Sequence, residues 1–317
     1  MRVKDLLNTA ARTAFSFEIL PPLKGNSIDK VYKTIDALRE FDPKYINITT
    51  HHSEFVQRTL DTGEVVKQNI RKRPGTVAVT AAIQHKYGIR AVPHIICSGF
   101  TKAETEYALI DLQFLEIFDL LVLQGDKGKI EPGFISQEDS HKYAIDLQGQ
   151  INRFNQGYFL DGSQMERIGT PFSYGVAGYP EKHGDAPSMD SDIYFLKEKV
   201  KAGADYVVTQ MFFDNRKYFD FVARCRAEGI TVPIIPGIKP IVFCNQQSVL
   251  PKIFGSELPE DFAAELQKCS TDEQAKEVGV EWCVQQCKEL IAQGVPSLHF
   301  YTFMATDSVR RVAQQVY

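Results

Sequence analysis

Several features that would place the chain in a special class of protein are missing. No apolar run is long enough to span a bilayer, and residues 1–5 do not open a signal peptide. The six cysteines are scattered without the spacing of a disulfide framework, which indicates free thiols in a reducing compartment. We therefore expect a cytoplasmic protein that does not enter a membrane.

A surplus of positive charge is missing as well. The chain has 36 Lys and Arg against 40 Asp and Glu, a net charge of −4, and it carries no basic tail. Nucleic acids and anionic membranes attract proteins through clustered Lys and Arg, so we expect neither as a partner. With 44% hydrophobic and 24% charged residues over 317 positions, the composition is that of an ordinary globular protein with a full core.

Common cofactor, metal and nucleophile motifs are also missing. The chain has no GxGxxG after a predicted strand, no Walker A loop, no HExxH and no GxSxG elbow. Cys283 and Cys287 share one helix face, but no second ligand pair follows them. His51 and His52 are adjacent, and adjacent residues of a strand point in opposite directions. The sequence therefore supports neither a Rossmann site nor a metal centre.

The chain does contain a regular alternation of strand-like and helix-like segments. Eight apolar or alternating segments predict strands, each followed by helical sequence, as in a parallel sheet. An uninterrupted series of this kind favours a closed (β/α)8 TIM barrel, with residues 1–317 as one catalytic domain. An open doubly wound sheet is the alternative. The predicted strands are 15–19, 45–49, 91–97, 119–123, 172–179, 205–212, 232–235 and 298–303.

The segments between the strands carry helix signals. Asn26 with Ser27, Thr101, and Asp190 with Ser191 are placed to cap three helices. A polar segment with three glycines, 155–171, predicts an insertion or a lid. The remaining helices are expected over about 61–71, 137–154, 216–228, parts of 246–269, most of 272–293, and 308–316.

The first predicted strand carries a glutamate near its carboxyl end. Apolar residues alternate with Ser16 and Glu18, and Pro21 ends the strand because proline has no backbone donor. A charged residue at such a place is expected to have an ion-pair or hydrogen-bond partner, or to have a function that requires the charge. Glu18 could face a wet edge of the sheet, pair with a buried Arg or Lys, or take part in catalysis.

Other polar residues also stand at the carboxyl ends of predicted strands, where TIM barrels build their active sites. Each has a plainer alternative: Asp126 could cap a turn, His94 could be satisfied in the core, and Gln210 could bond neighbouring backbone. Together they suit proton transfer and the orientation of a polar heterocycle. The set comprises Glu18, Thr49, Thr50, His51, His52, His94, Gln124, Gly125, Asp126, Tyr179, Pro180, Gln210 and Tyr301.

These strand ends resemble those of the methylenetetrahydrofolate reductase family. The resemblance runs in order over about residues 15–303, and its short motifs are specific when taken together. It implies a TIM barrel that holds FAD without a Rossmann motif, similar to the bacterial, single-barrel members. The matching segments are FE at 17–18, PP at 21–22, PH at 93–94, LxGD at 123–126, GYPExH at 178–183, TQMFFD at 209–214, IPGIxP at 235–240 and HFYT at 299–302.

The resemblance implies an oxidoreductase of folate one-carbon metabolism and methionine biosynthesis. NADH or NADPH would reduce FAD and leave, and 5,10-methylenetetrahydrofolate would then take its place and be reduced to 5-methyltetrahydrofolate. Glu18 matches the family's general acid, a role for which we expect burial to raise its pKa. Asp126 matches a residue beside flavin and pterin whose charge favours the cationic iminium. Gln210 matches a residue that orients pterin or nicotinamide.

The resemblance also implies binding roles and, from family precedent, a homo-oligomer. Thr49 matches a nicotinamide contact, and Gln246 and Tyr301 match substrate contacts. The residues implied for FAD are Thr50, His52, His94, Gln124, Gly125, Asp126, Ala144, Tyr179, His183, Ala186, Asp192 and Lys199.

The chain departs from the family pattern at several of these sites. Gln124 and Glu198 stand where the pattern has arginines, and Lys197 or Lys199 could supply the missing charge. A folate-binding Arg is missing after Thr302, and Arg310 or Arg311 could replace it; Leu250 stands where an aromatic stacks on nicotinamide. Two alternatives therefore stay open: a barrel reductase fed by a ferredoxin or partner flavoprotein, and a non-catalytic folate- or flavin-binding subunit.

Overall fold

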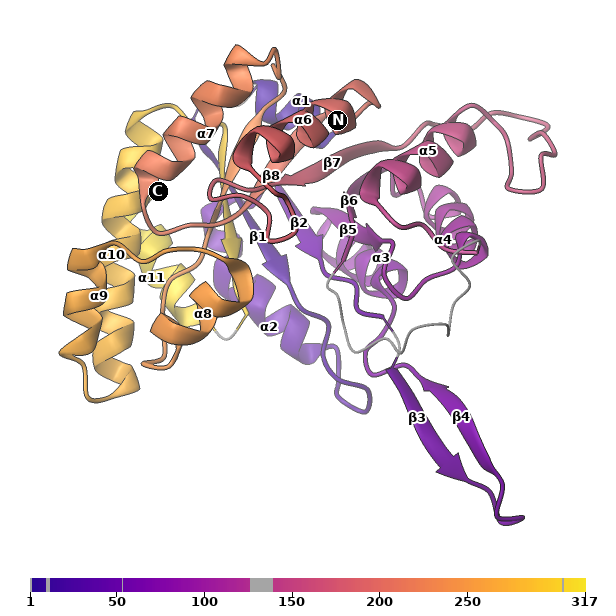
Figure 1. The fold of residues 1–317 in the computed structure, drawn as a ribbon, viewed down its shortest axis with the longest axis horizontal. Coiled ribbons are helices and arrows are strands. Elements are labelled where there is room, and N and C mark those ends of the chain that lie inside the picture. The colour runs from indigo at the N-terminus through magenta and orange to yellow at the C-terminus, as the bar shows by residue number, and fades with distance from the viewer. Residues whose placement is uncertain (1, 10–11, 53, 126–138, 304) are drawn as a thin grey trace.

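The chain forms a closed barrel of eight parallel strands surrounded by helices (Figure 1). This computed structural model confirms the predicted (β/α)8 barrel and rules out the open sheet. It describes residues 2–9, 12–52, 54–125, 139–303 and 305–317. Around the barrel the strand order is β1 (Ala14–Ile19), β10 (Ser297–Tyr301), β9 (Ile234–Ile238), β8 (Tyr206–Met211), β7 (Ser173–Gly178), β6 (Asp119–Leu123), β5 (Arg90–Ile96) and β2 (Tyr45–Ile48).

Helices cover the outside of the barrel, and one of the predicted caps is confirmed. Thr101 caps its helix as predicted, and it does so in a capping box with Glu104. The predicted cap at Asn26 and Ser27 is wrong, because Ile28 stands at the N-cap without a side-chain hydrogen bond, although the Asp29 amide donates to Ser27 Oγ at 3.1 Å. The helices are α1 (Val3–Thr9), α2 (Asp29–Leu38), η1 (Arg39–Phe41, a 3-10 helix), α3 (Thr76–Tyr87), α4 (Lys102–Phe114), α5 (Ala144–Asn155), α6 (Met189–Lys201), α7 (Asn215–Ala227), α8 (Gln246–Phe254), α9 (Glu260–Gln267), α10 (Asp272–Ala292) and α11 (Thr306–Val316).

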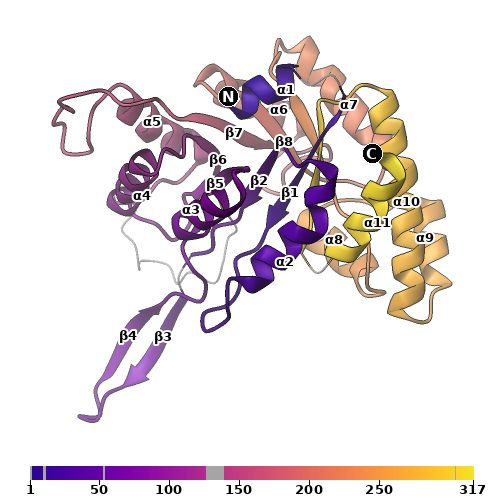
Figure 2. The ribbon, with the colours of Figure 1, turned by 180° about the vertical axis from the view of Figure 1, so that it is seen from behind.

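The segment that follows β2 is not the helix expected over 61–71. It forms an antiparallel hairpin of β3 (Glu54–Thr59) and β4 (Val65–Ile70), which projects away from the barrel (Figures 1 and 2). Gly63 takes a φ of 82° in the connecting turn, and β-branched residues follow it, a combination that favours a hairpin over a helix. The helix that leads to β5 is α3, which the sequence reasoning missed, as it missed α1.

Three other predicted boundaries move. Ser188 rather than Asp190 caps α6, since its hydroxyl accepts from the Ser191 amide at 3.1 Å. Helix α5 begins at Ala144 instead of 137, because the carboxylate of Asp146 accepts from the Tyr143 amide at 3.1 Å and fixes the start there. Strand β9 continues to Ile238, three residues past the predicted end, and so carries the proline and glycine of the IPGIxP motif into the barrel wall.

The predicted insertion at 155–171 lies outside the barrel, next to α4. The Leu160 amide donates to the carboxylate of Glu106 on that helix at 2.5 Å, and Tyr158 bridges Gln164 within the insertion. These contacts hold it against α4, so the described residues of this segment form an insertion and not a lid over the strand ends.

The amino-terminal end of the barrel is closed by α1. Val3 and Leu7 join Tyr45, Tyr206 and other inward-facing side chains in one apolar cluster. The Val3 amide donates to Asp119 Oδ1 at 3.0 Å, and Arg90 pairs with the same carboxylate at 2.7 Å. The opposite end, where the strands finish, is therefore the one left open for chemistry. Among the described helices, none is both long and apolar enough to cross a membrane.

Candidate active site

Polar side chains from distant parts of the chain meet at the carboxyl ends of the barrel strands. β1 and β10 pair in parallel, so that Glu18 lies beside Tyr301. We call this open end of the barrel the mouth. There Glu18 Oε2 lies 3.5 Å from Nε2 of His94, which is two strands away on β5. The structure thus brings together Glu18, His94 and Tyr301 as the sequence predicts. Asp126 lies outside the described residues.

His94 is a buried, neutral imidazole. It is 5% exposed, and burial together with the nearby His299 and His51 lowers its pKa to about 3. Its contact with Glu18 therefore joins a carboxyl to an uncharged ring, and its Nε2 makes no hydrogen bond with a described residue. A buried nitrogen left in this state at a cavity wall suits a polar ligand, which argues against the plainer reading of a satisfied core histidine.

Lys239 is a residue of the mouth that the sequence reasoning missed. It follows β9, is 6% exposed, and donates from Nζ to the Phe303 carbonyl at 3.0 Å. Burial lowers its pKa to about 8, an effect that the carboxylate of Glu18 opposes. A cation is therefore held close to the candidate acid. The signal was present, because a lysine at the end of an apolar barrel strand meets the criterion that selected Glu18.

Tyr301 forms one wall of the mouth. Its hydroxyl donates to the Thr209 carbonyl at 2.7 Å, and its ring passes so close to Gly237 that a Cβ there would lie 2.7 Å from it. Burial and the charge of Glu18 raise the pKa of the phenol well above its usual value. Tyr301 therefore stays protonated, with its proton engaged by backbone, and offers its ring as a surface.

The two glutamines predicted to bind substrate use their oxygens within the chain. Gln210 Oε1 accepts from the Met211 amide at 2.9 Å, the plainer alternative considered for it. Gln246 Oε1 accepts from the Val242 and Phe243 amides at 2.7 and 3.3 Å and so shapes the loop after β9. Neither side-chain NH2 group donates to a described residue, and both remain available as donors to a ligand.

Several residues implied for FAD cluster between β7 and α6. The rings of Tyr179 and His183 meet edge to face at 4.6 Å, and the His183 amide donates to Asp192 Oδ2 at 2.8 Å. The Ala186 amide donates to the His183 carbonyl at 3.0 Å. Lys199 Nζ donates to a β7 carbonyl at 3.0 Å, and burial lowers its pKa to about 8. These residues form one supported side of the mouth.

A second group lies after β2 and β5. Thr50 Oγ1 donates to the His94 carbonyl at 2.5 Å, and Thr49 Oγ1 lies 3.2 Å from His51 Nε2. His52 packs against Gly99, which has a φ of 76° and no space for a Cβ. These contacts lock the ends of β2 and β5 together.

Three more residues implied for FAD are on or after neighbouring elements. Gln124 and Gly125 follow β6, and the Gln124 carbonyl accepts from the Ser98 amide at 3.0 Å. Ala144 opens α5, the next helix along the chain. They stand on the same side of the barrel as the β5 end, but the loop that would connect them lies outside the described residues.

Of the four residues considered as replacements for the missing arginines, only Lys199 points toward the barrel, where its Nζ donates to a β7 carbonyl. Lys197 instead pairs with Glu228 at 3.0 Å on the surface, and Glu198 pairs with Lys201 at 2.7 Å. Arg310 and Arg311 pair with Glu40 and Glu277 at 2.8 and 2.5 Å on the outer helices, so the suggestion that either reaches the mouth is wrong.

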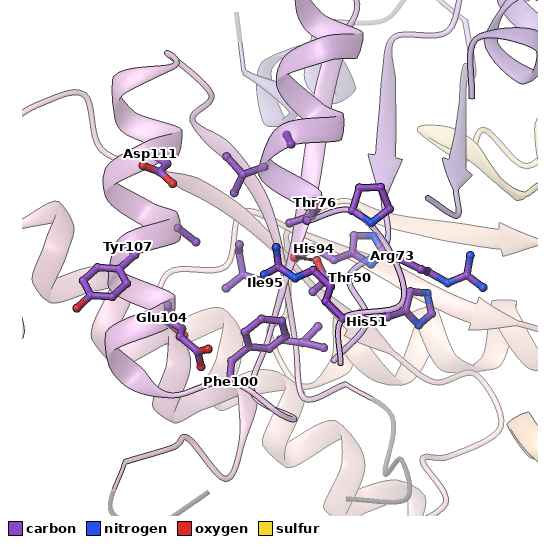
Figure 3. Close-up of a pocket in the computed structure, with 18 of the residues that line it drawn as sticks. Thr50, His51, Arg73, Thr76, His94, Ile95, Phe100, Glu104, Tyr107 and Asp111 are labelled. Carbon is purple, nitrogen blue, oxygen red and sulfur yellow. Dashed lines mark hydrogen bonds between the residues drawn. The ribbon is translucent and has the colours of Figure 1, made fainter. Parts of the chain in front are cut away.

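A cavity of about 590 Å³ lies between α3 and α4, beside the ends of β2 and β5 (Figure 3). Glu18, Lys239 and Tyr301 are not among the residues that line it. Thr50, His51 and His94 line it at the barrel, and Glu104, Tyr107 and Asp111 line it along α4. Among the described residues, no group of three His, Cys, Asp or Glu side chains is arranged to hold a metal ion. The mouth therefore offers an acid and buried cations, and a cavity large enough for an organic ligand lies beside it.

Comparison with known proteins agrees with this geometry. The family model for methylenetetrahydrofolate reductase matches residues 2–317. The 5,10-methylenetetrahydrofolate reductase of Salmonella typhimurium is 30% identical over 300 residues, which cover 94% of this chain and 89% of that protein. Methylenetetrahydrofolate reductase (NADH) 1 of Arabidopsis thaliana is 29% identical over 97% of this chain. The chain spans only about half the length of that plant relative, 49%.

Among solved structures, a Clostridium thermocellum protein described as binding two copies of 5-methyl-5,6,7,8-tetrahydrofolic acid has the same fold. Its TM-score is 0.58, with 13% identity, over 99% of this chain and 98% of the other. At that identity the likeness concerns the fold alone, whereas the family model covers nearly every residue. The chain belongs to the methylenetetrahydrofolate reductase family.

Proposed function

We propose that this protein reduces 5,10-methylenetetrahydrofolate to 5-methyltetrahydrofolate, with FAD as its cofactor and NADH or NADPH as the electron donor. The observation that carries the proposal is the mouth of the barrel, where Glu18 lies beside the neutral His94 and near the buried Lys239. Family membership over residues 2–317 supports it. A cytoplasmic location and a homo-oligomeric state remain proposals of the same kind.

The residues present fit a flavin. The unsatisfied Nε2 of His94 would gain a partner, and the supported group of Tyr179, His183, Asp192 and Lys199 provides aromatic, amide and cationic contacts. When bound, FAD would supply two-electron chemistry, with hydride accepted from nicotinamide and delivered to folate. Lys199 would compensate phosphate charge in place of the arginines that this chain lacks.

Glu18 is the proposed proton donor. Opening the imidazolidine ring of the folate requires a proton on the departing nitrogen, and the step leaves a carboxylate on Glu18. Because His94 is uncharged, it does not favour ionisation of Glu18 before the proton is transferred to the folate. The ammonium of Lys239 stabilises the carboxylate of Glu18 after the transfer. The raised pKa expected for Glu18 stays a prediction.

The other roles follow from the positions of the side chains. The NH2 group of Gln210 would donate to the pterin or the nicotinamide, since its oxygen is already held by the Met211 amide. The ring of Tyr301 would bound the folate on one side. Asp126 keeps its proposed role in stabilising the iminium.

Anaerobic stopped-flow kinetics test the proposal in two half-reactions. Purified protein should be yellow, NADH or NADPH should bleach it, and methylenetetrahydrofolate should restore the colour. Lack of flavin, or a reduced flavin that methylenetetrahydrofolate does not reoxidise, would overturn the proposal.

A protein electron donor is the second candidate, and one observation favours it. Leu250 stands at the position of the stacking aromatic and has no ring. It is also buried in a cluster with Phe213 and Phe262, so it offers nicotinamide no surface to stack on. If folate reoxidises dithionite-reduced flavin but neither nicotinamide reduces it, the donor is a ferredoxin or a flavoprotein.

A further inference from the structure

The outer surface of α4 and of the insertion beside it is apolar. The insertion adjoins α4, because the Leu160 amide donates to Glu106 at 2.5 Å and Gly169 lies against the side chain of Gln113. Six of the fourteen large hydrophobic side chains that are exposed in the described part of the chain lie here: Tyr107, Ile110, Phe114, Leu115, Leu160 and Ile168. An exposed helix normally turns polar residues to the solvent, so an apolar surface of this kind marks a site of interaction with a protein.

The residue spacing on α4 and α3 gives both helices this apolar exterior. On α4, Leu109 and Leu112 are buried against the barrel, whereas Tyr107 and Phe114, two turns apart, are 63% and 86% exposed on the other side. Helix α3, which lines the same cavity as α4, has no charged residue over 76–83. We call the outer surface of residues 71–75, α3, α4 and the insertion the α3–α4 face. It offers about 20 outward-facing residues, the number on one side of a standard protein interface.

Opposite charges stand on opposite sides of this face. Arg71 and Arg73 line the cavity where the chain leaves the hairpin and enters α3, and Asp111 lines it from α4, across the cavity from Arg73 (Figure 3). Among the described residues, neither arginine has a carboxylate partner, and the carboxylate of Asp111 makes no hydrogen bond or ion pair. A twofold axis through the middle of the face exchanges its two sides, so the charges of the face are complementary to those of a second copy.

We propose that the α3–α4 face binds a second copy of this chain in a twofold-symmetric contact. Arg71 and Arg73 of one copy lie over α4 of the other and pair with its Asp111, and the same contact is repeated by symmetry. Phe114 of each copy packs over the cavity of the other, between the two charged contacts. A different protein would have to match the charges and the aromatic residues separately, whereas a second copy matches them by symmetry. The inference rests on the homo-oligomeric state proposed above and not on the reaction.

The hairpin beside this face supports the same assignment. Among the described strands, β3 and β4 pair only with each other, and an isolated two-stranded hairpin is at most marginally stable in water. The hairpin leads directly to Arg71 and Arg73 and projects away from the barrel (Figure 2). A second copy on the α3–α4 face stands next to the hairpin and supplies the protein surface that the barrel of its own chain does not.

Sedimentation velocity of the purified protein at a series of concentrations tests the contact. Wild type should sediment as a dimer or a multiple of one. Phe114→Glu should halve that mass and raise the dissociation constant at least about hundredfold, because it places a charge at the centre of the contact in both copies. Ile253→Glu, at a 65% exposed position on α8 outside the face, is the matched control and should keep the wild-type mass. Because Phe114 is exposed, its variant should unfold at the wild-type temperature.

Charge reversal tests the twofold pairing. Arg71→Glu and Asp111→Arg should each weaken association at least about tenfold, because each brings like charges together twice in a symmetric contact. The variant that carries both changes should regain the wild-type dissociation constant, since its reversed charges again face charges of opposite sign.

Three results would overturn the inference: a monomer at every concentration, an oligomer that Phe114→Glu leaves intact, or a double reversal that associates no more tightly than the single ones. A monomer would also refute the homo-oligomeric state, whereas the other two results would refute only this face. Stopped-flow folate reduction in the same preparations tests the reaction separately, so the proposed reaction can stand when the contact fails.

Discussion

The two ends of the barrel differ in how completely their buried polar groups are hydrogen-bonded within the chain. At the amino-terminal end, Asp119 is 1% exposed and has its partners in place, the Val3 amide and Arg90. At the carboxyl end, Lys239 has a single hydrogen bond and the Nε2 of His94 has none among the described residues. The polar groups that stabilise the fold form their hydrogen bonds within the chain. The groups that we propose to bind a ligand retain unused hydrogen-bonding donors or acceptors.

The largest test of this comparison is Glu18→Gln. Loss of the proton donor should slow folate reduction by roughly 10²–10⁴-fold, the range typical of general acids. Flavin reduction by nicotinamide and the unfolding temperature should hardly change. Stopped-flow half-reactions measure both rates, with Glu64→Gln at the exposed hairpin turn as the control. Folate reduction at the wild-type rate would remove Glu18 from its role.

Removing the buried carboxylate at the amino-terminal end of the barrel should lower stability without changing the rate of folate reduction. Asp119→Ala leaves Arg90 and the Val3 amide without their acceptor, and breaking a buried pair costs about 3 kcal/mol or more. Denaturant unfolding should show that loss, while each folded molecule keeps its rate of folate reduction. Asp220→Ala, on the exposed face of α7, controls for loss of charge. A variant as stable as the control would contradict the assignment of Asp119 to stability.

Lys239→Met sharpens the comparison within the mouth. Without the ammonium, the carboxylate left on Glu18 is less stable, and we expect folate reduction to fall about tenfold while flavin reduction is unchanged. Because the Lys239 pKa is about 8, wild-type folate reduction should decline above that pH, and the variant should lose this decline. Lys33→Met is the exposed control, and identical pH profiles in all three proteins would rule out the effect.

Buried lysines also predict how stability depends on pH. Burial lowers the pKa of Lys199 and of Lys239 from 10.5 to about 8, so between these values the folded state binds fewer protons than the unfolded state. Stability should therefore rise as pH increases from about 8 towards 10.5. Unfolding measured across this window should show a smaller rise in Lys199→Met than in wild type. An equal slope would show that the ammonium of Lys199 is not desolvated.

Tyr301→Phe should have the smallest effect. It removes the hydrogen bond to the Thr209 carbonyl, worth about 1 kcal/mol, but keeps the ring that forms the wall. Folate reduction should change less than about threefold, because the phenol proton is engaged by backbone. A much larger loss in stopped-flow folate reduction would mean that Tyr301 donates to the substrate.

The success and the failures of the sequence reasoning have particular causes. Alternating or continuous apolar runs predict all eight barrel strands, since burial on one or both faces leaves that pattern in any strand. The helix expected over 61–71 is wrong because a hairpin exposed to solvent leaves no one-sided apolar pattern, and its signals are Gly63 in the turn and the β-branched residues that follow it. Glu18, His94 and Tyr301 were predicted at the mouth, and the structure places them there.

Lys239 was missed although its position is as unusual as that of Glu18. Its importance depends on the Phe303 carbonyl and on Glu18, which are far from it in the chain. The same is true of Arg310 and Arg311, whose partners Glu40 and Glu277 draw them away from the mouth. Which cation faces the site depends on side-chain partners brought close only by folding.

The amino-acid sequence by itself determined the barrel, the order of its strands along the chain and the identity of the residues at their ends, because these follow from local apolar patterns and turn residues. Only the tertiary structure decided which polar groups at those ends are already satisfied and which remain open to a ligand. Whether a group is satisfied depends on its burial and on its distance from side chains that are far away in the sequence. No local sequence pattern contains this information.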